Sequence, residues 1–131
     1  MRQIKIAVAD SRKSGRWSNV TWDWADFVAR CSETERTTET LSDYLNMPKD
    51  RQSDIKDVGG FVGGHLTDER AGRTKANIAL RSCLTLDIDH APADLWELLT
   101  KAYSGAAVCY STHKHTPESP RLRIVIPFDR D

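Results

Sequence analysis

The sequence predicts an α+β domain in which an antiparallel β-sheet carries helices on one face. Three segments with apolar side chains at every second position indicate the strands: Arg2–Ala9, Arg81–Asp89 and Arg121–Pro127. Helices are indicated by apolar side chains at helical spacing in the stretch that ends at Cys31 and in Pro92–Tyr103. We therefore expect layers of strands and helices around one core.

Composition indicates one folded domain without a strong overall charge. The chain has 131 residues, and its 19 Lys and Arg side chains balance 19 Asp and Glu. Any attraction to nucleic acid must therefore come from local clusters. The cysteines (Cys31, Cys83 and Cys109) are odd in number and lack C-x-x-C spacing, which argues against a zinc site or a disulfide framework. No segment has the pattern of a signal peptide or a membrane span, so we expect a reduced, cytoplasmic protein with no membrane partner.

The first eighty residues are expected to form an N-terminal α/β unit. After the strand Arg2–Ala9, a polar loop leads to a helix that Thr21 caps, and a second helix spans Leu41–Met47. The charged segment Lys49–Asp57 adds a short helical turn. Val58–His65 holds four glycines around two apolar residues, a pattern typical of a bulge or of the close approach of another backbone or a ligand.

A polar connector, Thr67–Asn77, is expected to join two antiparallel strands as a long hairpin. Its cations, with one at the start of the following strand, are candidates for contacts with nucleic acid: Arg70, Arg73, Lys75 and Arg81. A solvated hairpin without a ligand is the alternative for these side chains.

The remaining residues are expected to form a motif-bearing unit. From Arg81 the order is strand, helix, strand (Ala106–Ser111) and strand (Arg121–Pro127). This order matches the first four elements of a ferredoxin-like or RNA-recognition-motif-like βαββαβ unit, without its last helix and strand. We expect residues 1–131 to be a single domain, made of an N-terminal unit (1–80) and a motif-bearing unit (81–131), and truncated before that last helix and strand.

Two carboxylates share one face of the strand Arg81–Asp89. Asp87 and Asp89 are two residues apart, so their Cα atoms lie ~7 Å apart and their side chains can share a hard divalent cation such as Mg²⁺ or Mn²⁺. Without a ligand, the same pair is a solvated acidic strand end. By the same alternation, Ser111 and His113 share one face of the next strand and its extension, and Arg121 and Arg123 share one face of the last.

If the apolar faces share a core, these acids, imidazole and guanidinium groups meet on one surface. Carboxylates that hold a cation, together with positive groups that hold phosphates, supply what nucleotidyl transfer needs. We therefore expect one cleft lined by Asp87, Asp89, Ser111 and His113.

The same residues carry a family resemblance. Asp87-Ile88-Asp89, then Ser111-Thr112-His113, then the strand after Pro120, resemble the catalytic core of the archaeo-eukaryotic primase superfamily, in particular the primase-polymerases of phages, plasmids and integrated mobile elements. The first motif of that family is Asp-hydrophobic-Asp and its second is Ser-x-His. A third, a hydrophobic residue followed by Asp, lies further along than this sequence extends.

The resemblance implies a DNA primase-polymerase that acts in DNA replication. Asp87 and Asp89 would ligate Mg²⁺ or Mn²⁺, and His113 would contact the triphosphate of the incoming nucleotide. Ser111 belongs to the same motif, and Arg121 and Arg123 would assist at the phosphates by position. The implied partners are a single-stranded DNA template, nucleoside triphosphates and a helicase domain, either downstream in the chain or in trans.

Two alternatives remain open. The chain could be a non-catalytic module that binds nucleotide or DNA, because only two motif carboxylates are present. It could instead be a rolling-circle initiator-like nuclease that binds a metal through His113 and His115. Lys114 replaces the hydrophobic residue between the two histidines of that family, and Tyr103 and Tyr110 are poorly placed as nucleophiles.

Overall fold

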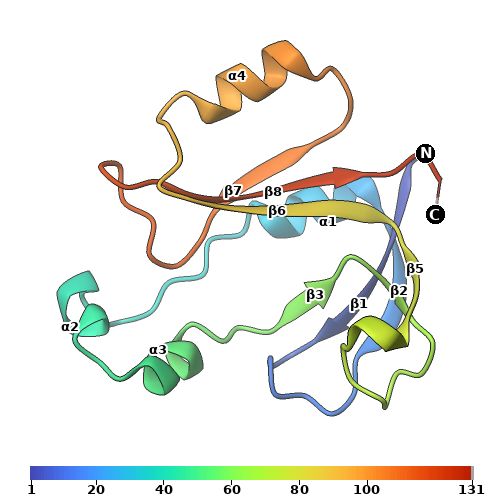
Figure 1. Cartoon of the computed structure of the whole chain (residues 1–131), viewed down its shortest axis with the longest axis horizontal. Coiled ribbons are helices and arrows are strands. Elements are labelled where there is room, and N and C mark those ends of the chain that lie inside the picture. Colours follow the sequence, from blue (N-terminus) through green and yellow to red (C-terminus); the bar gives the residue numbers. More distant parts are fainter. Residues whose placement is uncertain (131) are drawn as a thin grey trace.

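The structure is a computed structural model that describes residues 1–130. Its elements follow in the order β1 (Gln3–Ala9), β2 (Ser18–Asp23), α1 (Trp24–Cys31), α2 (Leu41–Leu45), α3 (Lys49–Ile55), β3 (Gly60–Val62), β4 (Gly64–Leu66), a 3₁₀ turn (Lys75–Asn77), β5 (Ile78–Arg81), β6 (Cys83–Asp89), α4 (Leu95–Ala102), β7 (Val108–Ser111) and β8 (Arg121–Pro127). Figure 1 shows their arrangement. Among these residues, no helix has the length and apolar character needed to cross a membrane.

The predicted α+β class and the antiparallel pairing are confirmed. The strands form three antiparallel sheets, in the orders β2-β1-β3, β4-β5 and β6-β8-β7. Strand β2 is absent from the sequence prediction, which placed Thr21 at the start of a helix. Thr21 lies in β2 opposite Lys5, and Asp23 is the residue that precedes α1. The helical stripe begins only at Trp24, so the apolar side chains just before it belong to a strand.

The glycine-rich segment divides between two sheets, with β3 paired to β1 and β4 paired to β5. The expected close approach of backbones is confirmed at Gly64, where an added Cβ would lie 1.9 Å from the carbonyl oxygen of Leu80. Residue Gly59 has φ +86°, a conformation that favours glycine. The connector after β4 joins two antiparallel strands, as the sequence predicts.

The predicted strand Arg81–Asp89 is two strands, because Arg81 ends β5 and Cys83 begins β6. Between them, Ser82 is buried and joins neighbouring segments: its N–H donates to the carbonyl of Gly63, and its carbonyl accepts from the N–H of Phe128, both at 2.9 Å. Its hydroxyl also accepts the Lys5 N–H at 2.9 Å. Strand β6 lies at the edge of its sheet, and β8 lies in the middle.

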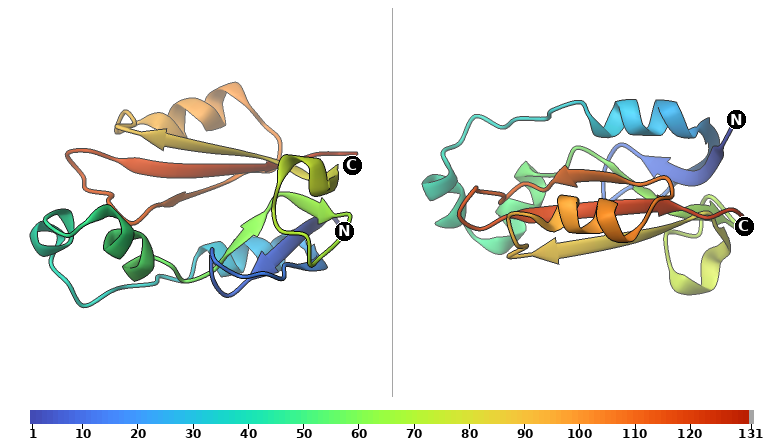
Figure 2. Two further views of the ribbon diagram at one scale, coloured as in Figure 1. Left: turned by 60° about the horizontal axis from the view of Figure 1, so that its bottom comes forward. Right: turned by 90° about the horizontal axis from the view of Figure 1, so that it is seen from above.

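One face of the β6-β8-β7 sheet packs on the N-terminal unit. Its buried side chains share a core cluster with strand β1 and helix α1; the cluster comprises Ile4, Ile6, Phe27, Cys83, Val108 and Val125. The units expected at residues 1–80 and 81–131 are therefore joined by common apolar packing. The two views of Figure 2 show this sheet and the β2-β1-β3 sheet as separate layers.

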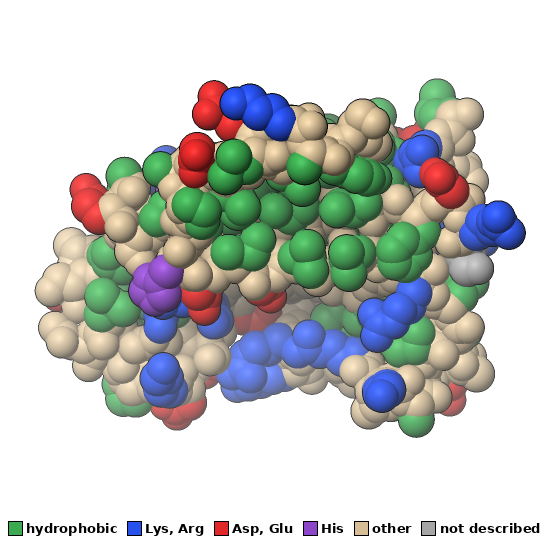
Figure 3. All heavy atoms as spheres, turned by 45° about the horizontal axis from the view of Figure 1, so that its top comes forward, with side chains coloured by type: hydrophobic (Ala, Val, Ile, Leu, Met, Phe, Trp, Pro, Cys, Tyr) green, Lys and Arg blue, Asp and Glu red, His purple; other side chains and the backbone are tan. Residues whose placement is uncertain are grey.

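Helix α4 lies on the other side of that sheet, the apolar side on which it was predicted (Figure 1). Helix α1 contributes Phe27 to the core on the opposite side, so the helices cover both faces rather than one. The middle strand is well covered, since Ile124 is 1% exposed. The edge strand is not: Leu84 and Leu86 are 42% and 38% exposed. Figure 3 shows a continuous band of hydrophobic side chains on this side of the molecule.

Candidate functional site

The two motif carboxylates lie beside the two arginines of the middle strand. Asp87 pairs in register with Arg123, and Asp89 pairs with Arg121. Directly paired residues of an antiparallel sheet point to the same face, so all four share the face that continues into the core. The predicted alternation of β6 and of β8 is confirmed in both strands.

Each carboxylate binds a guanidinium group. Arg123 donates from Nε to Oδ1 of Asp87 at 2.5 Å and from Nη2 to Oδ2 at 3.2 Å, so it holds both oxygens. Arg121 Nη1 lies 3.2 Å from Oδ1 of Asp89. Planar guanidinium and carboxylate groups match each other in this bidentate geometry. Both acids are thus neutralised by arginine in this arrangement.

Tyr110 completes the surroundings of Arg123. It stands opposite Arg123 in β7, and the two side chains are close enough to influence each other's pKa. Burial raises the pKa of Tyr110, and its interaction with Arg123 partly offsets that rise. The hydrogen bond with Asp87 raises the pKa of Arg123, and burial opposes it. The guanidinium therefore stays charged and is held from two strands.

Ser111 does not share the face of Asp87, which corrects the expectation that both line one cleft. Ser111 pairs with Leu122, and Leu122 pairs with Ile88, so Ser111 points to the face that α4 covers. Tyr110 and Val108 take the place expected for Ser111 and Cys109. Nothing in the alternation of this short strand distinguishes its two faces, because three of its four residues, Val108, Cys109 and Tyr110, are apolar.

His113 follows the end of β7 and lies against α2. Its ring centroid is 4.5 Å from that of Tyr44, at a tilt of 55°. Burial lowers the pKa of His113, the positive charges of Lys56 and Lys114 lower it further, and Glu39 opposes them. His113 is therefore a neutral imidazole at neutral pH, held among basic side chains.

A basic cluster missed by the sequence analysis surrounds this loop. Burial lowers the pKa of Lys114, and the nearby charges of Lys49, Arg121 and Lys56 lower it further, while Asp89 raises it. The Lys114 ammonium also lies 5.9 Å from the centre of the Tyr44 ring. We define the basic cluster as Lys49, Lys56, Lys114 and Arg121. It joins both ends of α3 to the β7–β8 loop and to β8, beside the acid pair.

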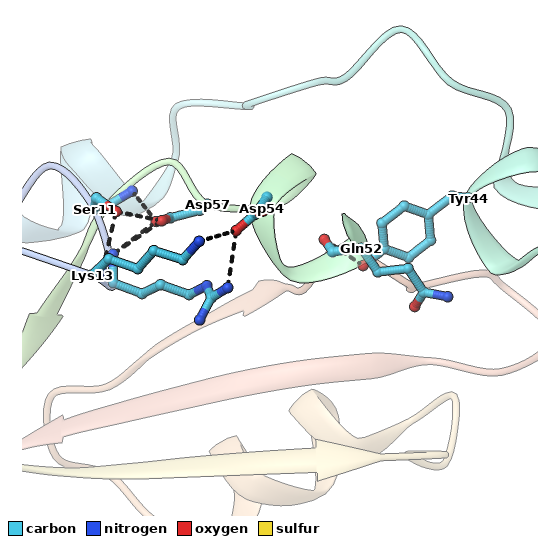
Figure 4. Close-up of polar contacts among 8 residues, drawn as sticks. Ser11, Lys13, Tyr44, Gln52, Asp54 and Asp57 are labelled. Carbon is cyan, nitrogen blue, oxygen red and sulfur yellow. Dashed lines mark hydrogen bonds and ion pairs between the residues drawn. The ribbon is translucent and has the colours of Figure 1, made fainter. Parts of the chain in front are cut away.

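Helix α3, which carries two of these lysines, is anchored on both sides. Figure 4 shows Asp57 accepting hydrogen bonds from Ser11, through Oγ at 2.6 Å, and from the backbone of Arg12. Asp54 forms ion pairs with the Arg12 and Lys13 side chains at 3.0 and 2.9 Å.

In the middle of α3, the buried Gln52 ties the helix to the segment that follows α2, donating to the carbonyl of Met47 at 2.9 Å. The carbonyl of Gln52 accepts from the Tyr44 hydroxyl at 3.3 Å. Helices α2 and α3, against which His113 and Lys114 lie, are therefore held together by hydrogen bonds and by buried side chains. In sequence, this segment was expected only as a short charged turn.

The four predicted nucleic-acid candidates lie apart from the acid pair. Arg70, Arg73 and Lys75 belong to the β4–β5 hairpin, which Figure 1 places at the opposite end of the molecule from α2 and α3. Arg73 stacks over the Trp17 ring at 5.0 Å, a contact between the hairpin and the loop that precedes β2. Arg81 ends β5, on the far side of Ser82 from Asp87.

Asp87 and Asp89, the acid pair, have the right chemistry to bind a hard divalent cation, but their oxygens are already bonded to arginines. Carboxylate oxygens are the ligands that Mg²⁺ and Mn²⁺ prefer, and Asp87 and Asp89 project side by side. Arg123 nevertheless holds both oxygens of Asp87. Across residues 1–130, no group of three or more His, Cys, Asp or Glu side chains is placed to hold a metal ion. A cation would therefore have these two ligands and water.

Together, these features define a class of domain: an α+β fold in which the acids of an edge strand pair with arginines of the middle strand, beside a loop that carries basic side chains. The chain belongs to the VapE N-terminal domain family, because the model of that family matches residues 1–131. VapE-like proteins are associated with phages and plasmids, so the expected phage or mobile-element context is confirmed. No curated protein and no solved structure matches the chain.

Proposed function

We propose that this chain is the N-terminal, nucleotide-handling part of a DNA primase-polymerase of a phage or another mobile element. The observation that carries the proposal is the register of β6 and β8, which sets Asp87 and Asp89 beside Arg123 and Arg121. The basic cluster and His113 extend this surface with further positive and neutral donors. Acids and cations side by side are what a metal-dependent phosphoryl reaction requires.

Each residue has a role in this proposal. Asp87 and Asp89 ligate Mg²⁺ or Mn²⁺, which neutralises charge on the reacting phosphates when bound. Arg121, Arg123 and Lys114 bind the oxygens of a triphosphate, and the guanidinium groups do so through two parallel hydrogen bonds. His113 donates a hydrogen bond to the same phosphates. A single-stranded DNA template and a helicase domain are the proposed macromolecular partners.

The topology supports the proposal independently of these side chains. Strands β6 and β7 run parallel to each other, joined through α4, and β8 lies between them antiparallel to both. This strand order is the one expected at the start of the ferredoxin-like plan that the order of elements in the sequence predicts.

A non-catalytic module that binds nucleotide or DNA is the second candidate. The ion pairs of both carboxylates favour it, since the surface then binds phosphates through its cations alone. A rolling-circle-type nuclease has less support. His115 accepts a hydrogen bond from the Arg121 N–H at 3.1 Å, whereas His113 packs on Tyr44, so the two imidazoles are committed to different contacts.

Two measurements test the proposal. Calorimetry with a nucleoside triphosphate and Mn²⁺ should show binding that depends on the metal, and Asp87→Asn should remove the metal-dependent part. Glu97→Gln, on α4 at the other side of the sheet, is the matched control and should bind as wild type does. Incorporation of labelled nucleotides on a single-stranded template distinguishes the enzyme from the module. Nucleoside triphosphate binding that is unchanged by Mn²⁺ and by Asp87→Asn would refute the nucleotidyl-transfer proposal.

A further inference from the structure

We propose that Arg123, assisted by Arg121, closes the acid pair to divalent cations, and that a bound triphosphate opens it by drawing the guanidinium groups away. Binding of the cation and binding of the triphosphate are then coupled through an exchange of ion-pair partners. This inference rests on the proposed function, because it concerns the same acids and the same phosphate ligand.

The geometry of the closed state is direct. A hard cation requires the carboxylate oxygens as ligands, and Arg123 already binds Oδ1 and Oδ2 of Asp87. Arg121 binds Oδ1 of Asp89. Two positive charges therefore stand where the cation must approach, and they repel it as well as occupying its ligands.

The ion pair between Asp87 and Arg123 is exposed to water, so the guanidinium can leave the carboxylate for a phosphate at little cost in stability. The side chains of Asp87 and Arg123 are 61% and 35% exposed, and ion pairs in contact with water contribute little to stability. A triphosphate offers the guanidinium the same bidentate geometry with more negative charge. Tyr110, which pairs with Arg123 across β7 and β8, stays beside the guanidinium when Asp87 is released.

Lys114 and the other members of the basic cluster attract a triphosphate to the side of the acid pair where Arg121 lies. Lys114 is close to the other members of the basic cluster, Lys49, Lys56 and Arg121, and the charge of Asp89 in the acid pair also acts on it. Phosphates held there lie within reach of the arginines. Linkage requires the reverse effect as well: a cation on the acid pair must strengthen triphosphate binding by the same factor.

The contrary explanation is that these are cross-strand ion pairs that only support the sheet. The two explanations predict different results for the protein without nucleotide. If the arginine closes the site, removing it tightens cation binding. If the pair is structural only, removing it lowers the melting temperature and leaves cation binding weak.

The test is Mn²⁺ binding to the nucleotide-free protein, followed by water proton relaxation. We expect Arg123→Gln to bind Mn²⁺ roughly tenfold more tightly than wild type, within the range of typical coupling between sites. Arg2→Gln is the matched control, because it removes one exposed Arg–Asp pair, with Asp129 at 2.9 Å, far from the acids in sequence and outside their strand pairing. The variant Arg123→Lys keeps the charge without the fork and should fall between wild type and Arg123→Gln.

Equal Mn²⁺ affinity of wild type and Arg123→Gln would overturn the inference, and so would an equal gain in Arg2→Gln. The double variant Asp87→Asn/Arg123→Gln must lose the gain, which shows that the metal binds at the acid pair. These outcomes are separate from the proposed function, which fails only if nucleoside triphosphate binding is independent of Mn²⁺ and of Asp87. Thermal unfolding of each variant, recorded in parallel, excludes loss of the fold as the cause.

Discussion

Replacing Gly64 by alanine should destabilise the protein far more than the same replacement at Gly60. Both glycines lie in the same glycine-rich segment and both begin a strand. An added Cβ at Gly64 would lie 1.9 Å from the carbonyl oxygen of Leu80 and 2.9 Å from its carbonyl carbon, whereas no atom lies within 4 Å of a Cβ at Gly60. The pair therefore isolates one backbone contact.

The magnitude follows from the distance that must be gained. Strands β4 and β5 must separate by about 1 Å, which weakens the ladder that pairs Gly64 with Arg81. Overpacking of this kind costs roughly 1–3 kcal/mol, and each weakened hydrogen bond adds about 1 kcal/mol. We expect a loss of about 3 kcal/mol, or ~10 °C in melting temperature for a domain of this size. Gly60→Ala should be neutral or slightly stabilising, since alanine restricts the unfolded chain.

Differential scanning calorimetry and urea unfolding of the two variants measure this difference. Circular dichroism of each folded variant checks that the strand content is retained. If Gly64→Ala and Gly60→Ala unfold at the same temperature, the β4–β5 contact does not restrict the backbone and the reasoning fails. The result bears on the site because β5 leads through Ser82 directly into β6.

Three further predictions concern the core, His113 and the anchor of α3. Ile6→Ala, at a fully buried position, should lower the free energy of unfolding by about 2–5 kcal/mol, whereas Leu98→Ala, at a half-exposed one, should change it by less than about 0.5 kcal/mol. Affinity for a triphosphate should rise as the pH falls below the ordinary histidine value of about 6.5, because the pKa of His113 is lowered in the free protein and a bound anion favours the protonated imidazole. Asp57→Asn should increase amide hydrogen exchange in α3, because the Asp57 carboxylate accepts the hydrogen bonds that hold it.

Each of these predictions has its own control. Equal losses in Ile6→Ala and Leu98→Ala would place the core elsewhere. The His113→Gln variant should flatten the pH dependence, and an unchanged profile would assign it to another group. Without ligand, the free energy of unfolding has the opposite pH dependence. Histidine in the unfolded chain binds a proton more readily than folded His113, so the contribution of His113 to stability is full above pH ~6.5 and is lost as the pH falls below that value. Unchanged exchange in Asp57→Asn would mean that other contacts hold α3.

Alternation along single strands was sufficient to predict the faces of β6 and β8, because each carries charged residues on one face and aliphatic residues on the other. It was insufficient for β7, whose apolar side chains occupy both faces. The prediction used the polarity of Ser111, which is uninformative because Ser111 ends the strand and is exposed, and such a position tolerates a polar side chain without a polar site around it. Strand β2 was missed since Thr21 was interpreted as the cap of the helix, which placed Trp22 inside the helix, beside its apolar stripe.

The basic cluster could not be predicted because its members come from three distant segments. Lys49 and Lys56 stand at the two ends of a short charged helix, a position in which lysine is ordinarily solvated. Only the packing of α2 and α3 against the β7–β8 loop, through Tyr44 and His113, brings these lysines to Lys114. The spacing of residues along the sequence does not predict a contact between segments this far apart.

The pairing of acids with arginines depends on the register of β6 against β8, and the core sets that register. Val125 is 0% exposed on one face of β8 and Ile124 is 1% exposed on the other, so a slip of one residue would exchange two buried environments. A slip of two residues would keep the faces but would move Val125 out of the core, and burying such a side chain contributes about 1.5–3 kcal/mol. The exposed ion pair between Asp87 and Arg123 contributes at most about 1 kcal/mol. Apolar packing therefore holds Arg123 beside Asp87 whether or not the two are bonded, which leaves the guanidinium free to change its partner without any change of fold.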